Sequence, residues 1–521
     1  MRGIMGPFQY VVTGREMTEY DRNTIEEFKV PALILMEQAA LAVTEEIIRR
    51  FPERGKKVLI LAGSGNNGGD AMAVARLLTQ RGFHVTLFWT SERQPGEVGQ
   101  TALCQYRILE KMQIPLVTEL PHEAYAIVVD GIFGVGLSRP VSERIGRILE
   151  IISRWDAWKV AVDVPSGVDS NTGKILGYGF RADCTITFSF FKLGLALYPG
   201  ASYAGKVLVK EIGITKKAFG SCPPSWRMLT GEALEHMPLR PVDGHKGSFG
   251  KVLVVAGNEA SGGAAYLSAL GALRAGCGMV CICTHKSQHS GLLSLFPEAM
   301  FALYEKEDEA EAVLEEKLAW ADVILLGPAL GLKETARILL RKVIRDSRKH
   351  LVIDADGLNL LSGTDLGDEL KKLQDSPQTR RKLILTPHVA ELARLAGCRV
   401  EEVLDREKEV LEKTALTWRA IIVGKDARTL VAEPEGRKCI NLAGNSGMAT
   451  AGSGDFLAGI IASLLAQGME TFEAAASGVY LHAMAGDYAA SRDNEYTLLA
   501  SDLAEGLKKL LNKNKESSES I

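Results

Sequence analysis

Short apolar runs alternate with helix-like segments along most of the chain. Lys57–Gly63 and Lys251–Gly257 repeat one local pattern, an apolar strand followed by a glycine-rich turn and a helical segment. Each copy opens a series of further strand-like runs. These are His84–Trp89, Ala126–Phe133, Lys159–Val164 and Asp183–Phe190 in the first half, and Met279–Thr284, Asp322–Leu326, His350–Asp354, Lys382–Thr386 and Ala420–Val423 in the second. This alternation predicts two α/β domains with mainly parallel sheets and helices on both faces.

A break in this pattern predicts the domain boundary. Between Lys216 and Thr230 the chain is rich in Gly, Pro and Ser, and 521 residues exceed what one core usually holds. We therefore expect domains over residues 1–217 and 228–511. Residues 512–521 are polar, and we expect them to form a disordered tail.

The composition narrows the class of partners. A net charge of −3 gives no general attraction to nucleic acid or to anionic membranes, and no apolar run reaches the length of a membrane span. The eight cysteines lack the paired spacing of a zinc site, and Cys281 and Cys283 fit a buried strand. We expect a cytoplasmic homo-oligomer that acts on small molecules, without nucleic acid or membrane partners.

The segment from Asn445 to Asp455 carries the strongest chemical signal. Small residues precede one carboxylate, and the apolar run from Phe456 to Ile461 follows. Small residues let the backbone approach a phosphate, and a helix that begins here directs unpaired N–H groups at it. Asp455 would then be a base for a hydroxyl that attacks phosphorus. The alternative is a glycine-rich turn with Asp455 as a helix N-cap.

Three loops of the first half carry acidic residues at predicted strand ends. They are Gly63–Asp70 (GSGNNGGD), which precedes a helical run from Ala71 to Arg81, Val129–Gly136 (VDGIFGVG) and Asp163–Asp169 (DVPSGVD). The carboxyl ends of parallel strands converge on the ligand crevice of an open α/β sheet. The first loop matches neither a dinucleotide-binding loop nor a P-loop, and it is equally compatible with a purely structural glycine turn.

Together these three motifs resemble those of the NAD(P)H-hydrate epimerase domain, over roughly residues 10 to 215. The resemblance implies a Rossmann-like, three-layer fold that interconverts the R and S forms of hydrated NADH or NADPH and binds K⁺. It implies Asn67, Asp130 and Ser166 as the K⁺ ligands, all with hard oxygen donors, and Asp163 as the proton-transfer residue. The residues that it implies for contact with the substrate are Asn66, Asn67, Gly68, Gly69, Asp70, Gly134, Val135, Gly136, Leu137, Ser138, Arg139, Pro140 and Asp163.

The second half carries further motifs at predicted strand ends. They are HKGSFG (245–250), DADGLN (354–359), TPHVAE (386–391) and GKDART (424–429). With the segment that ends at Asp455, they resemble the ADP-dependent NAD(P)H-hydrate dehydratase, a ribokinase-like α/β fold, over about residues 228 to 510. The resemblance implies that ADP phosphorylates the hydroxyl of the hydrate and that phosphate then leaves, giving NAD(P)H, AMP and phosphate.

The same resemblance implies roles for residues of the second domain. Asp455 would be the base, and the N–H groups of residues 451–454 would stabilise charge on the transferred phosphoryl group. We expect Mg²⁺ to be held largely by the nucleotide. The implied nucleotide-binding residues are Lys425, Asp426, Ala427, Arg428, Thr429 and Gly454, and the implied contacts to the substrate are Ala264, Gly331, His388 and Asp455.

Several side chains keep two interpretations. Asp163 could cap the turn at Pro165, and His388 could be a neutral helix cap. Lys192 could be a second, weaker candidate for the proton-transfer group or an exposed lysine. Lys246 could neutralise phosphate or face water, and the roles of Asp354 and Asp356 stay open.

Two alternative functions also stay open. The first is a ribokinase-like small-molecule kinase whose N-terminal domain only binds a ligand. The second is a dehydratase whose first domain is a non-catalytic regulatory module. The sequence does not decide between NADH and NADPH hydrates or between ADP and ATP.

Overall fold

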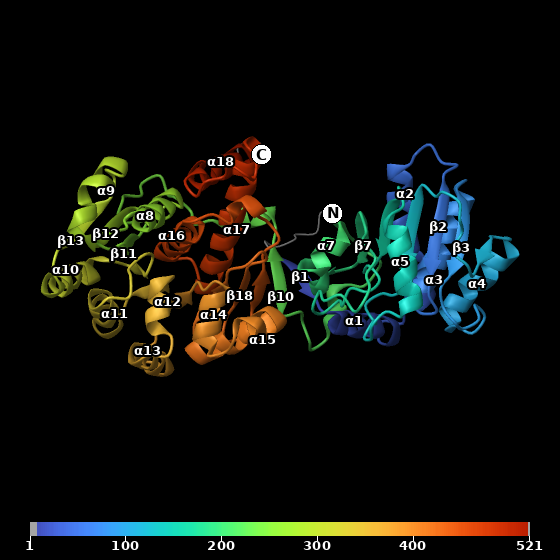
Figure 1. Ribbon diagram of the computed structural model, residues 1–521, viewed down its shortest axis with the longest axis horizontal. Helices are drawn as coiled ribbons and strands as arrows, with labels where there is room; N and C mark the ends of the chain where they lie inside the picture. The colour runs from blue at the N-terminus through green and yellow to red at the C-terminus, as the bar shows by residue number, and fades with distance from the viewer. Residues whose placement is uncertain (1–7, 519–521) are drawn as a thin grey trace. The chain divides into compact units, whose positions relative to one another are not determined.

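The computed structural model of the protein describes residues 8–518 and divides into two compact units (Figure 1). One comprises residues 10–226, and the other comprises residues 227 onward together with residues 8 and 9. The division at Trp226 falls inside the predicted join from Lys216 to Thr230. The first unit begins at Tyr10 rather than at residue 1.

The first unit is built on a parallel sheet with the strand order β4-β3-β2-β5-β6-β7-β9. The strands are β2 (Lys57–Ala62), β3 (His84–Trp89), β4 (Leu116–Val117), β5 (Ile127–Gly131), β6 (Trp158–Val162), β7 (Cys184–Phe188) and β9 (Lys206–Lys210). A short strand β1 (Phe8–Val12) pairs in parallel with β8 (Phe191–Lys192). The strand runs predicted for the first half are therefore confirmed.

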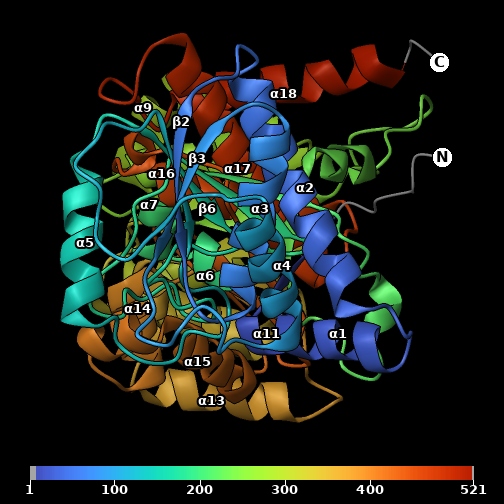
Figure 2. The ribbon, with the colours of Figure 1, turned by 90° about the vertical axis from the view of Figure 1, so that its right-hand side faces the viewer.

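Helices cover both faces of this sheet because both faces are apolar. Val58, Ile60 and Ala62 pack with one group of helices, whereas Leu59 and Leu61 pack on the opposite side against α5. Figure 2 shows α5 on one side of β2 and β3, and α2, α3 and α4 on the other. The helices are α1 (Gly14–Glu26), α2 (Ala32–Arg50), α3 (Asn66–Gln80), α4 (Gln100–Lys111), α5 (Glu143–Ser153), α6 (Leu193–Ala196) and α7 (Gly200–Ala204).

The second unit contains a longer sheet in the order β13-β12-β11-β14-β15-β16-β17-β18-β19. Its pairs are parallel up to β17, and β17-β18-β19 is an antiparallel extension. The strands are β11 (Lys251–Val255), β12 (Met279–His285), β13 (Met300–Tyr304), β14 (Val323–Leu326), β15 (His350–Ile353), β16 (Leu383–Leu385), β17 (Ile421–Gly424), β18 (Leu430–Ala432) and β19 (Lys438–Ile440), and β10 (Trp226–Leu229) is next to β19.

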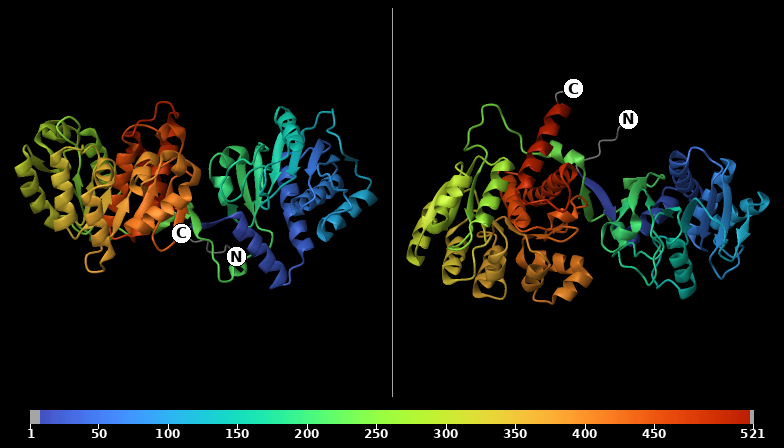
Figure 3. Two further views of the ribbon diagram at one scale, coloured as in Figure 1. Left: turned by 60° about the horizontal axis from the view of Figure 1, so that its bottom comes forward. Right: turned by 45° about the horizontal axis from the view of Figure 1, so that its top comes forward.

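One face of this sheet, with Val252 and Val254, packs against α8, α16 and α17. The other face, with the fully buried Leu253 and Val255, is covered by α10, α11 and the helices up to α15 (Figures 1 and 3). The helices are α8 (Gly263–Arg274), α9 (His289–Leu295), α10 (Glu307–Trp320), α11 (Glu334–Asp346), α12 (Asp356–Leu361), α13 (Asp365–Asp375), α14 (Val389–Ala396), α15 (Val400–Trp418), α16 (Ser453–Ala466), α17 (Thr471–Arg492) and α18 (Asp502–Ser518). The predicted α/β layers are confirmed in both units.

Two boundaries differ from the prediction. Helix α3 begins at Asn66 with Gly65 as its N-cap, so more than half of the predicted glycine loop is already helix. Helix α18 runs through residues 512–518, which we expected to be disordered, because the buried Leu503 and Leu507 anchor a helix that extends into the polar residues. Residues 519–521 lie outside the described part. Within residues 8–518, none of the helices combines the length and apolar character that a bilayer crossing needs.

Candidate active sites

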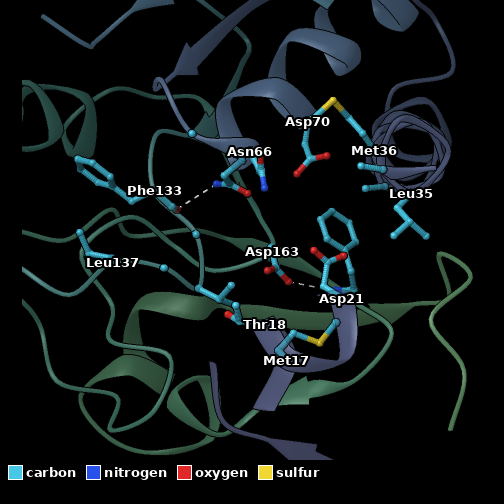
Figure 4. Close-up of a pocket in the computed structure, with 18 of the residues that line it drawn as sticks. Met17, Thr18, Asp21, Leu35, Met36, Asn66, Asp70, Phe133, Leu137 and Asp163 are labelled. Atoms are coloured by element: carbon cyan, nitrogen blue, oxygen red, sulfur yellow. Dashed lines mark hydrogen bonds between the residues drawn. The ribbon is translucent and has the colours of Figure 1, made fainter. Parts of the chain in front are cut away.

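A cavity of about 550 Å³ lies at the carboxyl end of the first sheet (Figure 4). Most of the residues predicted for substrate contact line it, namely Asn66, Asn67, Asp70, Gly134, Val135, Gly136, Leu137, Ser138, Arg139 and Asp163. Helix α1 and the start of α2 add an apolar side with Met17, Leu35 and Met36. Three strand-end loops therefore meet at one concave site, as the sequence predicts.

Gly68, Gly69 and Pro140 do not line this cavity. A Cβ on Gly68 would lie 1.9 Å from the carbonyl oxygen of Gly63, and a Cβ on Gly69 would lie 2.4 Å from the Cε of Met36. These two glycines let helix α3 pack closely on its surroundings. Their role in the structure is close packing, as expected of a structural glycine turn.

Asp163 lies directly after β6 and forms a buried ion pair with Lys192. The Lys192 Nζ donates to Asp163 Oδ1 over 2.6 Å and to the Phe188 carbonyl over 2.7 Å. Lys192 is fully buried, so it is not an exposed lysine, and burial lowers the pKa of its ammonium. Oδ1 of Asp163 also accepts hydrogen bonds from the Thr187 hydroxyl and the Phe188 N–H. These contacts fix the carboxylate at the cavity wall and leave no support for a cap on the Pro165 turn.

Two more carboxyl groups line the same cavity. Asp70 extends from α3, and Asp21 extends from α1. Burial, followed by the charges of Asp163 and Asp21, raises the pKa of Asp70 well above its usual range. Burial and the charge of Asp163 also raise the pKa of Asp21. Sequence reasoning missed Asp21 because it lies inside an ordinary amphipathic helix, away from any strand end.

The residues predicted to bind K⁺ form one hydrogen-bonded group. The Ser166 hydroxyl and N–H both donate to Asp130 over 2.7 Å, Ser166 Oγ accepts the N–H of Phe133 over 2.9 Å, and Asn67 Nδ2 donates to the Phe133 carbonyl over 3.0 Å. Asp130 is fully buried, and burial raises its pKa to about 6 against the opposing effect of these hydrogen bonds. The Ser166 hydroxyl, the Asp130 carboxylate and the Phe133 carbonyl thus lie together, and the Asn67 amide contacts that carbonyl through its nitrogen. Hard oxygen donors of these kinds suit an alkali cation.

In the second unit, helix α16 begins at Ser453, with Gly452 as its N-cap at a φ of +90°. Asp455 is in the first turn, so it is not the N-cap. The N–H groups of Gly454 and Asp455 have no partner within the helix, whereas the Ser453 N–H reaches the Thr450 carbonyl over 3.3 Å. Burial, followed by the charge of Asp354, raises the pKa of Asp455 to about 6, and Lys425 opposes this shift. A carboxylate of this kind is suited to act as a general base near neutral pH.

Lys425 links the predicted nucleotide loop to this helix start. Its Nζ donates to Asp354 Oδ1 over 2.6 Å, and Asp354 is almost fully buried. A Cβ on Gly454 would lie 3.2 Å from the same Nζ. The predicted nucleotide residues Asp426, Ala427, Arg428 and Thr429 form the partly exposed connection between β17 and β18. A lysine and a helix N-terminus thus lie next to each other, an arrangement that favours binding of a phosphate.

The other predicted substrate contacts of the second unit, Ala264, Gly331 and His388, are at or next to helix starts and loops of this unit. His388 is the N-cap of α14 and accepts the Ala390 N–H through Nδ1 over 3.1 Å, so the capping interpretation holds, but half of its side chain stays exposed. The backbone N–H of Gly331 donates to Asp356 over 2.8 Å. Ala264 is in the first turn of α8, and Lys246 is on an exposed loop.

A buried histidine at the start of α16 was missed. Nε2 of His482, on α17, lies 3.1 Å from Oγ of Ser453. Burial lowers the pKa of His482 to about 4, so it is neutral at pH 7. Nothing in the sequence marks this residue, because the pair depends on how α17 packs against α16.

Each of the two units matches a family of known proteins. Residues 252–509 match the family model for NAD(P)H-hydrate dehydratase, and residues 32–194 match that for the YjeF-related protein N-terminus. The chain is 36% identical over 536 residues to the bifunctional NAD(P)H-hydrate repair enzyme of Moorella thermoacetica, covering 98% of each chain. It is 33% identical to the enzyme of the same name from Escherichia coli, covering 92% of this chain and 89% of that one. The chain belongs to the family of bifunctional NAD(P)H-hydrate repair enzymes.

Solved structures are similar to the dehydratase unit. A ribokinase-like superfamily protein from Enterococcus faecalis shares 32% identity at a TM-score of 0.49, covering 56% of this chain and 96% of that chain. The ADP/ATP-dependent NAD(P)H-hydrate dehydratase of Bacillus subtilis, co-crystallised with ATP and Mg²⁺, shares 28% identity at a TM-score of 0.47, covering 55% and 98%. For this repair-enzyme family member, the predicted order of a Rossmann-like three-layer domain and a ribokinase-like α/β domain holds.

Proposed function

We propose that this protein repairs hydrated NADH and NADPH with two active sites. The first unit equilibrates the R and S epimers, and the second dehydrates the S form at the expense of ADP, which gives NAD(P)H, AMP and phosphate. The observation that carries the proposal is the presence, in one repair-family chain, of a carboxylate-lined cavity and of an anion-binding helix start with its own carboxylate.

The dehydratase reaction follows from the contacts around Asp455. Hydroxide is a poor leaving group, whereas phosphate is a good one. Asp455 takes the proton of the substrate hydroxyl as its oxygen bonds to the β-phosphorus of ADP, and the bond from that phosphorus to AMP breaks. The N–H groups of Gly454 and Asp455 and the ammonium of Lys425 stabilise charge on the transferred phosphoryl group. The C–O bond then breaks, phosphate leaves with the electron pair, and the neighbouring carbon loses a proton to restore the double bond.

We propose that Mg²⁺ enters this site with the nucleotide. Among residues 8–518, no group of three or more His, Cys, Asp or Glu side chains is arranged to hold a metal. The carboxylates of Asp354 and Asp356 are near Asp455, but Asp354 already binds Lys425. Bound Mg²⁺ would offset phosphate charge, and Lys425 to Thr429 together with Gly454 would hold the nucleotide.

In the epimerase unit we propose that Asn67, Asp130 and Ser166 hold K⁺, supported by the hydrogen bonds that bring their side chains together around the Phe133 backbone. Bound K⁺ would offset the buried charge of Asp130. These residues would then fix the loop from Gly134 to Arg139, which lines the cavity. Asp163 takes or returns the proton of the reacting hydroxyl, and Lys192 holds its carboxylate in place through the 2.6 Å contact.

We further propose that the protein is a cytoplasmic homo-oligomer. Its eight cysteines are free thiols, which suits a reducing compartment. Exposed apolar side chains at Phe28, Leu33 and Ile34 offer a surface for a second copy. The function itself needs no macromolecular partner.

A direct assay tests the function against a ribokinase-like kinase. The protein is incubated with hydrated NADH and ADP while absorbance of the regenerated dihydropyridine and phosphate release are followed. We expect one phosphate per NADH formed. A phosphorylated hydrate that accumulates without release of phosphate would instead indicate a kinase with a binding domain attached.

A further inference from the structure

The epimerase cavity contains more acidic groups than its nearest cation can neutralise. Asp21, Asp70 and Asp163 all line it, and Lys192 and Arg139 are the basic residues among its described lining. Lys192 is committed to Asp163 through the 2.6 Å contact, and Arg139 is on an exposed loop. Two carboxyl groups from two different helices therefore face the cavity without a cation of their own.

Asp70 and Asp163 approach the cavity from different elements. Figure 4 shows Asp70 extending from α3 at the top of the cavity, and Asp163 and Asp21 below it. A planar ring placed between them would meet Asp70 on one side and Asp163 on the other. Burial and the charges of two neighbouring carboxylates raise the pKa of Asp70. Asp163 instead accepts a charge-assisted hydrogen bond from Lys192 over 2.6 Å. Two carboxyl groups in such different surroundings can serve as the acid and the base of one reaction.

The chemistry of the substrate requires such a pair. Hydration of an enamine places the hydroxyl on the carbon next to the ring nitrogen, so the nitrogen lone pair can expel it. Inversion at that carbon needs an acid for the departing hydroxyl on one face. It also needs a base for the water that returns on the other face.

We propose that Asp70 is the second catalytic residue of the epimerase, opposite Asp163, and that Asp21 is a positioning residue whose charge holds the proton on Asp70. The inference rests on the epimerase function proposed above. Asp70 gives its proton to the hydroxyl as the C–O bond breaks and water leaves, while the nitrogen lone pair forms a C=N bond. Water then bonds to the same carbon on the other face, Asp163 takes its proton, and the C=N electrons return to nitrogen. The reverse reaction, or exchange with solvent, returns the proton from Asp163 to Asp70.

The test uses the full chain without ADP, so that the dehydratase is silent. Pure R hydrate is supplied, and formation of the S epimer is followed by chromatography. We expect Asp70→Asn to lower kcat roughly 10²–10⁴-fold, with little change in KM and with an unchanged or higher midpoint of thermal unfolding. An unchanged kcat with a raised KM would make Asp70 a binding residue only and would overturn the inference.

Asp21→Asn tests the second part through the pH profile. The acid must be protonated, so activity is lost as pH rises through the pKa of Asp70. Without the charge of Asp21 that pKa falls, and we expect the alkaline limb to move to lower pH by about half a unit or more. Glu26→Gln, which removes an exposed carboxylate from the same helix, should leave the profile unchanged.

An alkaline limb of Asp21→Asn that coincides with that of the wild type would refute the role of Asp21. If Asp70→Asn does not fold, the alkaline limb of the Asp21→Asn pH profile still tests the inference. A wild-type protein that does not epimerise at all would refute the proposed function instead, so the two failures are distinguishable.

Discussion

The two units use glycine beside a helix start for different physical purposes. At α3, Gly68 lets the helix close on its own loop, since a Cβ there would lie 1.9 Å from the Gly63 carbonyl oxygen. At α16, Gly454 leaves space next to Lys425, whose Nζ would lie 3.2 Å from an added Cβ. At the first helix start the glycine packs on its own backbone while Asn66, Asn67 and Asp70 line the cavity, and at the second the glycine lies next to a lysine. Similar glycine-rich sequences can therefore serve close packing in one domain and, as we propose, phosphate binding in the other.

The carboxylates of the two proposed sites also differ in their cation partners. In the first unit the proposed catalytic carboxylate of Asp163 has a buried lysine of its own. In the second unit Lys425 pairs with Asp354, and Asp455 has no cation of its own at the helix start. Lys192 is thus committed to the carboxylate proposed for proton transfer, whereas Lys425 also lies beside the helix start that we propose for phosphate.

The largest expected effects separate the two sites. Asp455→Asn should lower dehydration roughly 10²–10⁴-fold, the usual contribution of a general base, while epimerisation persists. Asp163→Asn should lower epimerisation by a similar factor while pure S hydrate is still dehydrated. Each variant is the matched control of the other, and both activities are measured on each protein. A single substitution that abolishes both activities in a folded protein would contradict the separation.

The buried ion pair of the first unit predicts a large effect on stability. Lys192→Met leaves Asp163 buried without its partner, so we expect the free energy of unfolding to fall by about 3–5 kcal/mol. The double variant Lys192→Met/Asp163→Asn leaves no unpaired charge and should lose less. Denaturant unfolding of both proteins measures the difference. Equal losses would show that the lysine stabilises the domain through packing alone.

The comparison of the two glycines is tested by alanine. Gly68→Ala places a methyl group against rigid backbone and should cost about 1–3 kcal/mol. Gly454→Ala meets only the flexible end of Lys425, so we expect a change in stability within about 0.5 kcal/mol, but a higher KM for ADP. Thermal unfolding and nucleotide titration measure the two effects. The reverse ranking would contradict the assignment of the two helix starts.

A smaller effect concerns the pH dependence of dehydration. Asp455 must be ionised to act as a base, and its pKa is about 6, so kcat/KM should fall as pH decreases through about 6. The charge of Asp354 contributes to this raised pKa. Asp354→Asn should therefore move the acid limb to lower pH, and a pH series of kcat/KM measures the shift. A limb that moves to higher pH would show that loss of the Lys425 partner dominates.

Sequence reasoning identified features that are encoded locally. Apolar runs such as Lys57–Ala62 and strand-end acids such as Asp130 and Asp163 follow from short-range pattern and topology. Asp21 and His482 were missed because each is on a helix whose orientation depends on distant packing. The burial of Lys192 was also undecided, since one lysine after a strand can face solvent or protein. Local pattern thus located the loops that line the cavity but not the helix-borne groups that surround them.

The central claim is that two separate sites act in sequence on the two epimers. The most direct test supplies an equilibrium mixture of R and S hydrates with excess ADP to wild-type protein and to Asp163→Asn, under conditions of slow spontaneous epimerisation. We predict that the wild type converts the whole mixture to NADH with one phosphate released per molecule. Asp163→Asn should stop once the S fraction is consumed. Complete conversion by Asp163→Asn at the wild-type rate would contradict the account.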